Sequence, residues 1–314
     1  MNKNNILYIK KMMSVQECAE LLNSSLDGRN KEEAVFNVIQ NSDLDKRLQI
    51  CNYFAENYGK SLYSELKSKL SGHFKALAIH LFLHPITFCA KMLKKGLKSF
   101  GGDDSVVLEV LSSHNEEELR QIEEAFKAET QKDLSQEIEK NFSGVMKKNL
   151  LNLLHIPRGK SDPSKEKCER LASLLIDVGE SSWTGDENVF KEVFIQCSAE
   201  ELILIGRYYL KKTGNNMLDV INDKCTGKNK ALLREILYNN IIPQELYAEK
   251  VYLSIKGLGT NTTLLNRVLI SRNEIDMDEI KKFYEQKYNV TMREDIIGDT
   301  SGNYQNLCLY LGHC

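Results

Sequence analysis

The chain has 314 residues, of which 42% are hydrophobic and 27% are charged, the balance of an ordinary globular protein. Its 42 basic and 44 acidic side chains give a formal net charge of −2, so bulk charge draws it to neither nucleic acid nor a membrane. Any attraction to an anionic surface must be local or must come from a bound cation. Only 4 prolines occur, and Leu, Lys and Glu are abundant, which favours helix.

The chain begins with a short tail, residues 1–13, that has no apolar stretch of the kind found in signal peptides. The 8 cysteines include no CxxC pair and fall in apolar or helical patterns, as reduced thiols do, so we expect a reducing, cytoplasmic compartment. The longest apolar runs, such as 76–83, are too short to span a bilayer. Any membrane contact should therefore be peripheral, at the inner face of the plasma membrane or at other membranes.

A Ser/Thr-Gly pair followed by a leucine-rich amphipathic run recurs four times along the chain. The glycines of these pairs are Gly72, Gly144, Gly227 and Gly302, at spacings of 72, 83 and 75 residues. Three of the runs end at a proline, which cannot continue a helix interior and so marks a boundary. A recurrence of this kind predicts a repeat architecture.

Upstream of each pair, apolar residues recur at intervals of three and four, the helical period, so each repeat should hold about five short helices. The stretch 158–165, RGKSDPSK, is the most loop-like part of the chain. The predicted organisation is a tail at 1–13, repeat one at 14–85, repeat two at 86–157, a linker at 158–162, repeat three at 163–240 and repeat four at 243–314.

Each repeat resembles an annexin repeat, and the resemblance covers essentially the whole chain and is strongest over 256–304, KGLGTNTTLLNRVLISRNEIDMDEIKKFYEQKYNVTMREDIIGDTSGNY. The resemblance implies an all-α fold of four five-helix repeats arranged in a slightly curved disc. It also implies calcium sites that bridge the protein to phospholipid head groups. Long-tailed annexins bind partners through the tail, so the short tail here implies little of that function.

Repeat four carries the complete calcium motif of this family. Its loop, 255–260, has two glycines, whose backbone freedom lets loop carbonyls turn toward one point, and 38 residues separate Thr260 from Asp299. The family pattern implies that the carbonyls of Ile255, Gly257 and Gly259 and the carboxylate of Asp299 hold Ca²⁺, a cation that prefers oxygen ligands. Water or a lipid phosphoryl oxygen would complete the shell. The alternative reading is a helix-connecting turn, with Asp299 only as a cap.

Repeat one lacks this motif, because its loop at 25–30 has no GxG and the acid position holds Lys69. We expect no calcium there. Lys69 is either a solvated surface lysine or a direct contact for a phosphate.

Repeat two has kept part of the motif. Its loop at 97–102 has lost one glycine, and the acid position holds Asn141, whose amide oxygen is a weaker, uncharged ligand. Asp103 and Asp104 either support a weak site or begin the next helix, where acidic residues suit the helix dipole.

Repeat three is the hardest to align, and we expect its site to be lost. The loop spans 179–187, and Lys224 stands at the acid position. Trp183 matches a loop tryptophan of some annexins, and it either inserts at a membrane interface or packs back on its own loop.

Other features are weaker indications. Arg272 matches an annexin arginine near a polar central channel, and we interpret it as a structural ion-pair partner. The basic run 91–98 is either a membrane patch or a solvated face. The histidines have no triad or metal-motif context, so we expect no enzyme.

These observations predict calcium-dependent binding to acidic phospholipid surfaces, with Ca²⁺ as the cofactor, no nucleic-acid partner and self-association on membranes as an option. The alternative is a scaffold of the same fold that binds cytoskeletal or other proteins largely without calcium, because three of the four sites are degraded.

Overall fold

The computed structural model describes residues 13–98, 101–159 and 163–314. Within these residues the regular structure is helical and no strand occurs, so the predicted all-α class is confirmed. None of the helices in this part of the chain is long and apolar enough to cross a bilayer. The predicted tail lies outside the described residues except for Met13, as do three residues of the predicted linker, at 160–162.

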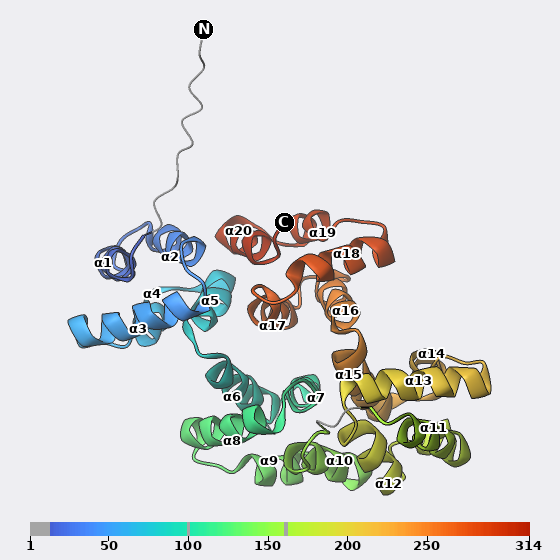
Figure 1. Ribbon diagram of the computed structural model, residues 1–314. Helices are drawn as coiled ribbons and strands as arrows, with labels where there is room; N and C mark the ends of the chain where they lie inside the picture. The colour runs from blue at the N-terminus through green and yellow to red at the C-terminus, as the bar shows by residue number, and fades with distance from the viewer. Residues whose placement is uncertain (1–12, 99–100, 160–162) are drawn as a thin grey trace. The chain divides into compact units, whose positions relative to one another are not determined.

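The described residues divide into two compact units, one formed by residues 13–84 and 248–314 and the other by the described part of residues 85–247. The first unit contains the helices α1 (Val15–Ser25), α2 (Lys31–Gln40), α3 (Leu44–Tyr58), α4 (Leu62–Lys69), α5 (Gly72–Ala78), the 3-10 helix η1 (Ile79–Phe82), most of α16 (Pro243–Ile255), α17 (Thr262–Arg272), α18 (Met277–Tyr288), α19 (Met292–Asp299) and α20 (Gly302–Leu311) (Figure 1). In this unit α5 packs against α17 and α20, and α2 packs against α20. Segments from the two ends of the chain therefore share one core.

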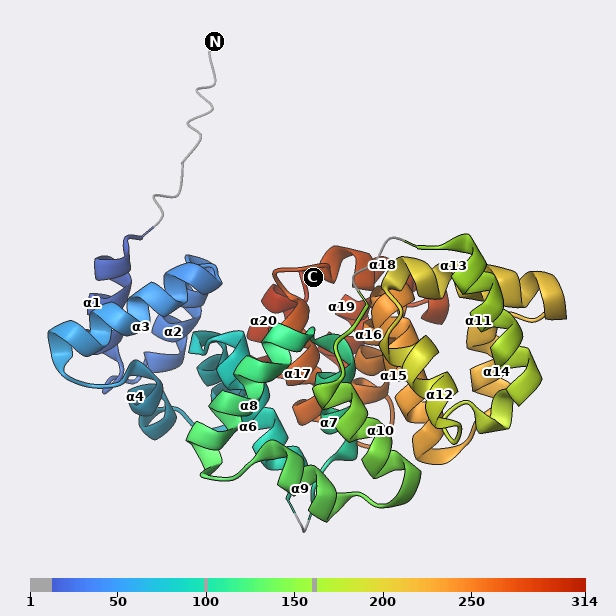
Figure 2. The same cartoon turned by 60° about the horizontal axis from the view of Figure 1, so that its bottom comes forward.

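The second unit is a continuous piece of the chain. It contains α6 (Pro85–Gly96), α7 (Asp104–Ser113), α8 (Glu116–Thr130), α9 (Leu134–Asn141), α10 (Gly144–His155), α11 (Lys165–Val178), the 3-10 helix η2 (Glu180–Ser182), α12 (Glu187–Val189), the π-helix η3 (Phe190–Ile195), α13 (Ala199–Thr213), α14 (Met217–Lys224) and α15 (Gly227–Ile241) (Figure 2). Helix α6 packs against α7 and α8, α11 packs against α13, and α15 packs against α7.

The Ser/Thr-Gly pairs mark the same structural position in every repeat. Each glycine is the first residue of the last α-helix of its repeat and has a left-handed backbone, with φ between 57° and 63°. The four residues are Gly72 (63°), Gly144 (57°), Gly227 (60°) and Gly302 (61°). A side chain in this conformation is strained, which explains why glycine recurs at a spacing that the sequence alone reveals.

The helix before each pair also repeats. It is eight residues long in all four cases, and it ends at Lys69 in α4, Asn141 in α9, Lys224 in α14 and Asp299 in α19. These four residues occupy the acid position of the calcium motif in the sequence comparison of the repeats. The structure therefore places them equivalently, at the C-terminal end of a short helix.

Repeat three departs from the pattern in its second helix. A three-residue helix, α12, runs directly into the π-helix η3, where the other repeats have one regular helix of 10 or 11 residues. The π-turn accommodates a crowded aromatic cluster in which Trp183, Phe190 and Phe194 are fully buried. This difference gives a physical reason for the poor sequence alignment there.

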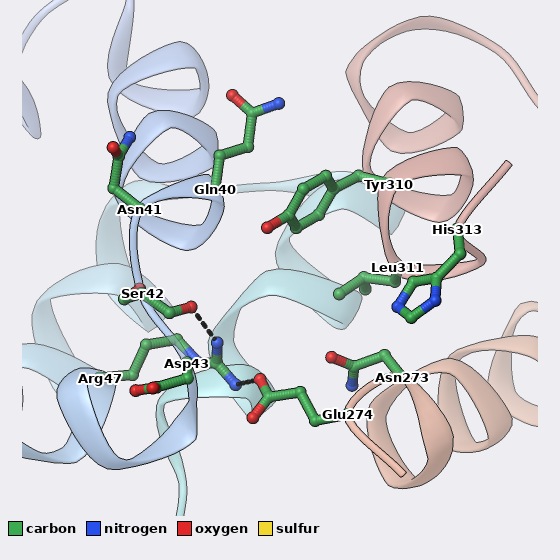
Figure 3. Close-up of a pocket in the computed structure, with 10 residues that line it drawn as sticks. All are labelled: Gln40, Asn41, Ser42, Asp43, Arg47, Asn273, Glu274, Tyr310, Leu311 and His313. Atoms are coloured by element: carbon green, nitrogen blue, oxygen red, sulfur yellow. Dashed lines mark hydrogen bonds and ion pairs between the residues drawn. The ribbon is translucent and has the colours of Figure 1, made fainter. Parts of the chain in front are cut away.

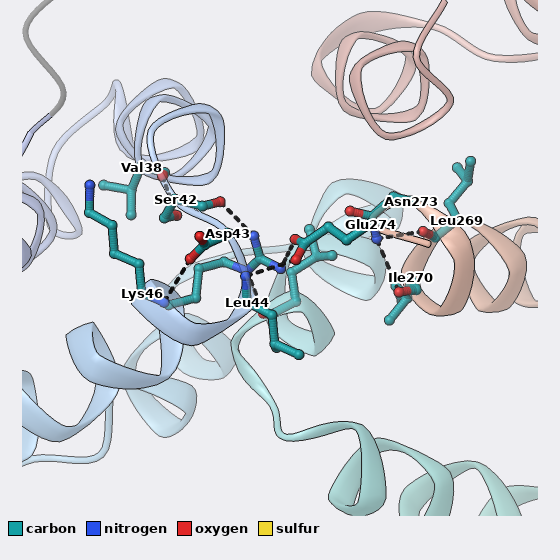
Figure 4. A network of polar contacts seen from close by, with 11 residues as sticks. Val38, Ser42, Asp43, Leu44, Lys46, Leu269, Ile270, Asn273 and Glu274 are labelled. Carbon is teal, nitrogen blue, oxygen red and sulfur yellow. Dashed lines mark hydrogen bonds and ion pairs between the residues drawn. The ribbon is translucent and has the colours of Figure 1, made fainter. Parts of the chain in front are cut away.

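A buried arginine joins the two ends of the chain within the first unit. Arg47 donates to the carbonyl of Ser42 and to Glu274 Oε1, each at 2.7 Å (Figure 3). It also donates to the carbonyl of Leu81 at 2.7 Å. The other oxygen of Glu274 accepts from the amide of Leu44 at 2.9 Å, at the start of α3 (Figure 4). A cavity of about 320 Å³ lies beside this pair. Each of the three guanidinium nitrogens of Arg47 donates one of these bonds, so its charge is accommodated in the core.

The eight cysteines form no disulfide, and most are buried, as reduced core thiols are. Burial raises the pKa of the Cys89 and Cys197 thiols to about 12, so neither is a reactive thiolate near neutral pH.

Candidate calcium site

The loop between α16 and α17 is shaped by two glycines. Gly257 has φ 121° and Gly259 has φ 81°, conformations that L side chains rarely adopt, although neither glycine has a heavy atom near the place of a Cβ. The amide of Asn261 donates to the carbonyl of Ser254 at 2.7 Å and closes the loop on the end of α16. Backbone conformation therefore decides the residue type at these two positions.

Asp299 is tied to this loop across 39 residues of sequence. The Thr260 hydroxyl donates to the main-chain oxygen of Asp299 at 2.9 Å. In the Asp299 side chain, Oδ2 is buried and has no hydrogen-bond partner. A buried carboxylate oxygen without a partner is costly, and such an oxygen is expected to meet a cation or another donor.

These features fit a hard cation. The loop offers main-chain carbonyls on an exposed turn, and the chain brings one carboxylate to its side through Thr260. Ile255 is buried at the end of α16, whereas Gly257 and Gly259 are exposed in the turn. Among the described residues there is no group of three or more His, Cys, Asp or Glu that could hold a metal, so a calcium ion here would depend mainly on carbonyl oxygens.

A second carboxylate beside the loop, which sequence reasoning missed, is Asp295. It accepts from the Tyr284 hydroxyl at 2.5 Å and pairs with Lys256 Nζ at 3.3 Å. Lys256 also lies over the ring of Tyr252, at 5.1 Å from its centroid. Burial and the bond to Asp295 raise the pKa of Tyr284. The charge of the loop residue Lys256 is therefore paired with a carboxylate of α19. The sequence signal for Asp295 was its position one helical turn before Asp299, which places both side chains on the same face of the helix.

In repeat one, the position equivalent to Asp299 already carries a cation. Lys69 Nζ lies 2.5 Å from Asp27 Oδ1, and Asp27 belongs to the loop between α1 and α2. The hydrogen bond and charge of Lys69 lower the pKa of Asp27, and the same contact raises the pKa of Lys69. The sequence offered a solvated lysine or a phosphate contact, and neither interpretation included this pair of Lys69 with a carboxylate of its own repeat.

In repeat two, the acidic residues serve the helix that follows. Asp103 caps α7 and accepts from the amide and hydroxyl of Ser105 at 3.0 and 2.6 Å, and Asp104 pairs with Lys228 at 2.6 Å. Asn141 donates its amide to the carbonyl of Glu137 at 2.8 Å. The second of the two sequence interpretations, that these acids begin the next helix, is the one the structure supports. Ser99 and Phe100 of this loop lie outside the described residues.

In repeat three, Trp183 packs back into the protein. Its indole Nε1 donates to the carbonyl of Leu175 at 3.0 Å, and its ring contacts Phe194 and Tyr209. Of the two options from sequence, packing back on its own loop is the one that this structure shows. The nearby Glu180 accepts from the Tyr209 hydroxyl at 3.0 Å. Its backbone hydrogen bond and the bond from Tyr209 lower the pKa of Glu180, and the charge of Lys224 lowers it further.

Contacts also bear on two weaker sequence indications. Arg272 pairs with Asp276 through its Nε at 2.8 Å, which confirms the structural ion pair. In the basic run of repeat two, Lys91 and Lys94 both pair with Glu129, at 2.7 and 3.0 Å. Part of that positive charge is therefore neutralised by the protein itself.

Comparison with known proteins identifies the family. The annexin family model matches residues 17–81, 88–153 and 247–311. Human annexin A13 is 31% identical over 301 residues, covering 95% of each chain. The structure of annexin III superposes with a TM-score of 0.88 at 27% identity over 96% of this chain and 94% of that one. A calcium-bound annexin (Sm)1 structure superposes with a TM-score of 0.84 at 26% identity over 95% of this chain and 90% of that one. This chain belongs to the annexin family.

Proposed function

We propose that the protein binds acidic phospholipid surfaces through one calcium ion held in repeat four. The carbonyls of Ile255, Gly257 and Gly259 and the carboxylate of Asp299 would hold the ion. The observation that carries the proposal is the buried, unpartnered Oδ2 of Asp299 in a residue bonded to the loop through Thr260.

The chemistry of such a site suits a membrane surface. A calcium ion bound mainly by uncharged carbonyls keeps most of its positive charge, and an exposed turn leaves open positions for an anionic oxygen. A phosphoryl or carboxyl oxygen of a lipid head group would complete the shell. The protein's net charge of −2 offers no bulk attraction, so the ion supplies it locally.

The other three repeats contribute little calcium binding in this proposal. Lys69 and Lys224 stand where Asp299 stands, and Asn141 offers no charge. A single site gives weak attachment, because avidity grows with the number of sites engaged at once. We therefore expect a high calcium requirement, or binding that rises steeply with protein density on the membrane if copies assemble there.

Co-sedimentation with phosphatidylserine vesicles tests the proposal, with calcium and with a chelator. The wild-type protein is expected to bind only with calcium, and Asp299→Asn, which removes the charge but keeps the shape, is expected not to bind. Asp27→Asn is the matched control, because it removes the loop carboxylate that Lys69 already neutralises, and it should bind like the wild type.

Binding that persists in chelator or in Asp299→Asn would contradict the proposal. Absence of binding under all conditions would favour the second candidate, a scaffold for protein partners such as cytoskeletal elements. The loss of the ligand set in three of four repeats is the observation that favours that candidate.

A further inference from the structure

A thiol and an imidazole that are 25 residues apart in sequence meet in the second unit. The Sγ of Cys89, in α6, lies 3.5 Å from Nε2 of His114, the residue that follows α7. Cys89 is 9% exposed, whereas His114 is half-buried. Neither residue belongs to the candidate calcium site, so the proposed function leaves this contact unexplained.

The contacts of His114 determine which ring nitrogen offers a lone pair. Nδ1 lies 3.0 Å from the carbonyl oxygen of Val110, and because a carbonyl oxygen can only accept, Nδ1 carries the proton of the neutral ring. Nε2 is therefore the acceptor, and it faces the Cys89 thiol. Histidines that bind a metal through one ring nitrogen commonly donate from the other to a main-chain carbonyl, which is the arrangement of His114.

The distance and the local charge both suit a zinc ion. Bonds of about 2.3 Å from zinc to sulfur and about 2.0 Å from zinc to nitrogen, at a tetrahedral angle, place the two ligand atoms roughly 3.5 Å apart. Sγ and Nε2 have this separation before any ion is added. After burial, the charges of Glu109 and Glu118 also raise the pKa of the Cys89 thiol. The negative charge that disfavours a free thiolate favours a cation at the same place.

A reactive thiol is the other chemistry that a Cys–His pair can serve. A nucleophilic cysteine needs a lowered pKa, whereas burial raises the pKa of Cys89 to about 12. A metal ion removes this obstacle, because a thiol that coordinates a metal loses its proton on binding. The contact therefore favours metal binding over nucleophilic catalysis.

We propose that Cys89 and His114 bind one Zn²⁺ ion, with water completing its coordination. The thiol proton leaves to solvent as the bond from Sγ to zinc forms, and Nε2 donates its lone pair to the same ion. Because the described residues contain no group of three or more His, Cys, Asp or Glu that could hold a metal, the protein supplies two ligands and the remaining positions are open to solvent. This site is separate from the calcium site, and either can fail without the other.

Cobalt spectroscopy tests the site, because a bond from a thiolate to Co²⁺ absorbs in the near ultraviolet and oxygen-bound Co²⁺ lacks this band. The reduced wild-type protein should show the band with about one Co²⁺ per chain and release about one proton per ion. Zn²⁺ should remove the band, whereas millimolar Ca²⁺ should not, since calcium prefers oxygen ligands. Absence of the band, or its removal by calcium, would overturn the proposal.

Three variants assign the ligands. Cys89→Ser keeps a hydrogen-bond donor for the imidazole but removes the thiolate, and it should weaken Zn²⁺ binding roughly tenfold or more. His114→Gln should have a similar effect while leaving the buried thiol in place. Cys51→Ser is the matched control, because the Sγ of Cys51 meets a carbonyl oxygen, that of Phe82 at 3.5 Å, and it should bind like the wild type.

The end of the chain holds a second cysteine beside a histidine, His313 followed by Cys314. Cys314→Ser should keep the cobalt band. A band that is lost in Cys314→Ser and kept in Cys89→Ser would place the ion at the chain end and overturn the assignment. Zn²⁺ affinity that is unchanged in both Cys89→Ser and His114→Gln would reduce the contact to a hydrogen bond.

Discussion

Repeats one and four carry side chains of opposite charge at the same structural position. In both, an eight-residue helix ends beside the loop that joins the first two helices of the repeat. In repeat four, that helix ends in Asp299, which has an unpartnered carboxylate oxygen. In repeat one, it ends in Lys69, which pairs with the loop carboxylate of Asp27 at 2.5 Å.

This difference shows that a repeat without the calcium motif can place a lysine ammonium of its own beside the loop carboxylate. The ammonium of Lys69 meets a loop carboxylate without any ion from solution, so repeat one has its own cation. Repeat four lacks such a group, because its loop lysine, Lys256, is turned to Asp295. Calcium dependence in this protein should therefore follow the charge at one position of the repeat.

The largest effect should come from changing the turn of repeat four itself. Gly259→Ala places a side chain at φ 81°, which should cost about 1–2 kcal/mol of stability or force the turn to relax. We expect calcium affinity, measured by titration calorimetry with phosphatidylserine vesicles, to fall about tenfold or more. Gly206→Ala, in helix α13 with only one ordinary contact at 3.9 Å, is the control that should keep wild-type affinity.

A charge reversal in repeat one should make that repeat respond to calcium. In an Asp299→Asn background, Lys69→Glu puts a second carboxylate next to Asp27 and close to Glu65. The resulting repulsion should lower the unfolding temperature, and millimolar calcium should raise it again by roughly 2 °C, because an ion that binds only the folded state stabilises it. The same unfolding temperature with and without calcium would show that the lysine is not what separates the two repeats.

Removing the Tyr284 hydroxyl should have a smaller effect. Tyr284→Phe removes the bond to Asp295 and should lower the free energy of unfolding by about 1 kcal/mol in urea titrations at pH 7.

The raised pKa of Tyr284 also predicts a pH dependence. Below about pH 10, tyrosine is protonated in both the folded and unfolded states, so its contribution is fully present there. Above pH 10, the unfolded state loses the proton first, and stability should fall as pH rises. Tyr209, whose pKa burial and Glu180 raise to about 12, should contribute in the same direction between pH 10 and 12. In Tyr284→Phe the decline above pH 10 should be shallower, and an unchanged slope would argue against this assignment.

The smallest effect is expected from removing the charge of Lys69. Lys69→Gln breaks a pair in which the Asp27 side chain is largely exposed, and exposed ion pairs contribute little to stability. The unfolding temperature and the calcium dependence of vesicle binding should both match the wild type. A large drop in the unfolding temperature would mean that the repeat-one pair is essential to the fold, and a changed calcium dependence would mean that repeat one takes part in calcium binding.

The repeat architecture was predictable because its markers are local. The Ser/Thr-Gly pairs recur since each glycine adopts a left-handed φ at the start of a helix, and this requirement is visible in sequence. The equivalence of Lys69, Asn141, Lys224 and Asp299 was also predictable, since helices of equal length end at all four.

Contacts between distant side chains were not predictable in the same way. The pairing of Lys69 with Asp27, the bond from Tyr284 to Asp295 and the burial of Trp183 all depend on how helices pack. The sequence alone does not distinguish a lysine or tryptophan side chain that faces solvent from one that contacts another part of the protein. The ligand roles of Ile255, Gly257, Gly259 and Asp299 remain a prediction that rests on the family resemblance and on the geometry of the loop.

A crystal structure of the protein grown with millimolar calcium tests the central claim most directly. We predict one calcium ion at the α16–α17 turn, bound by the carbonyls of Ile255, Gly257 and Gly259 and by the carboxylate of Asp299, with the Lys69–Asp27 pair intact in repeat one. An ion at the repeat-one loop, or none at the repeat-four turn at saturating calcium, would contradict the account.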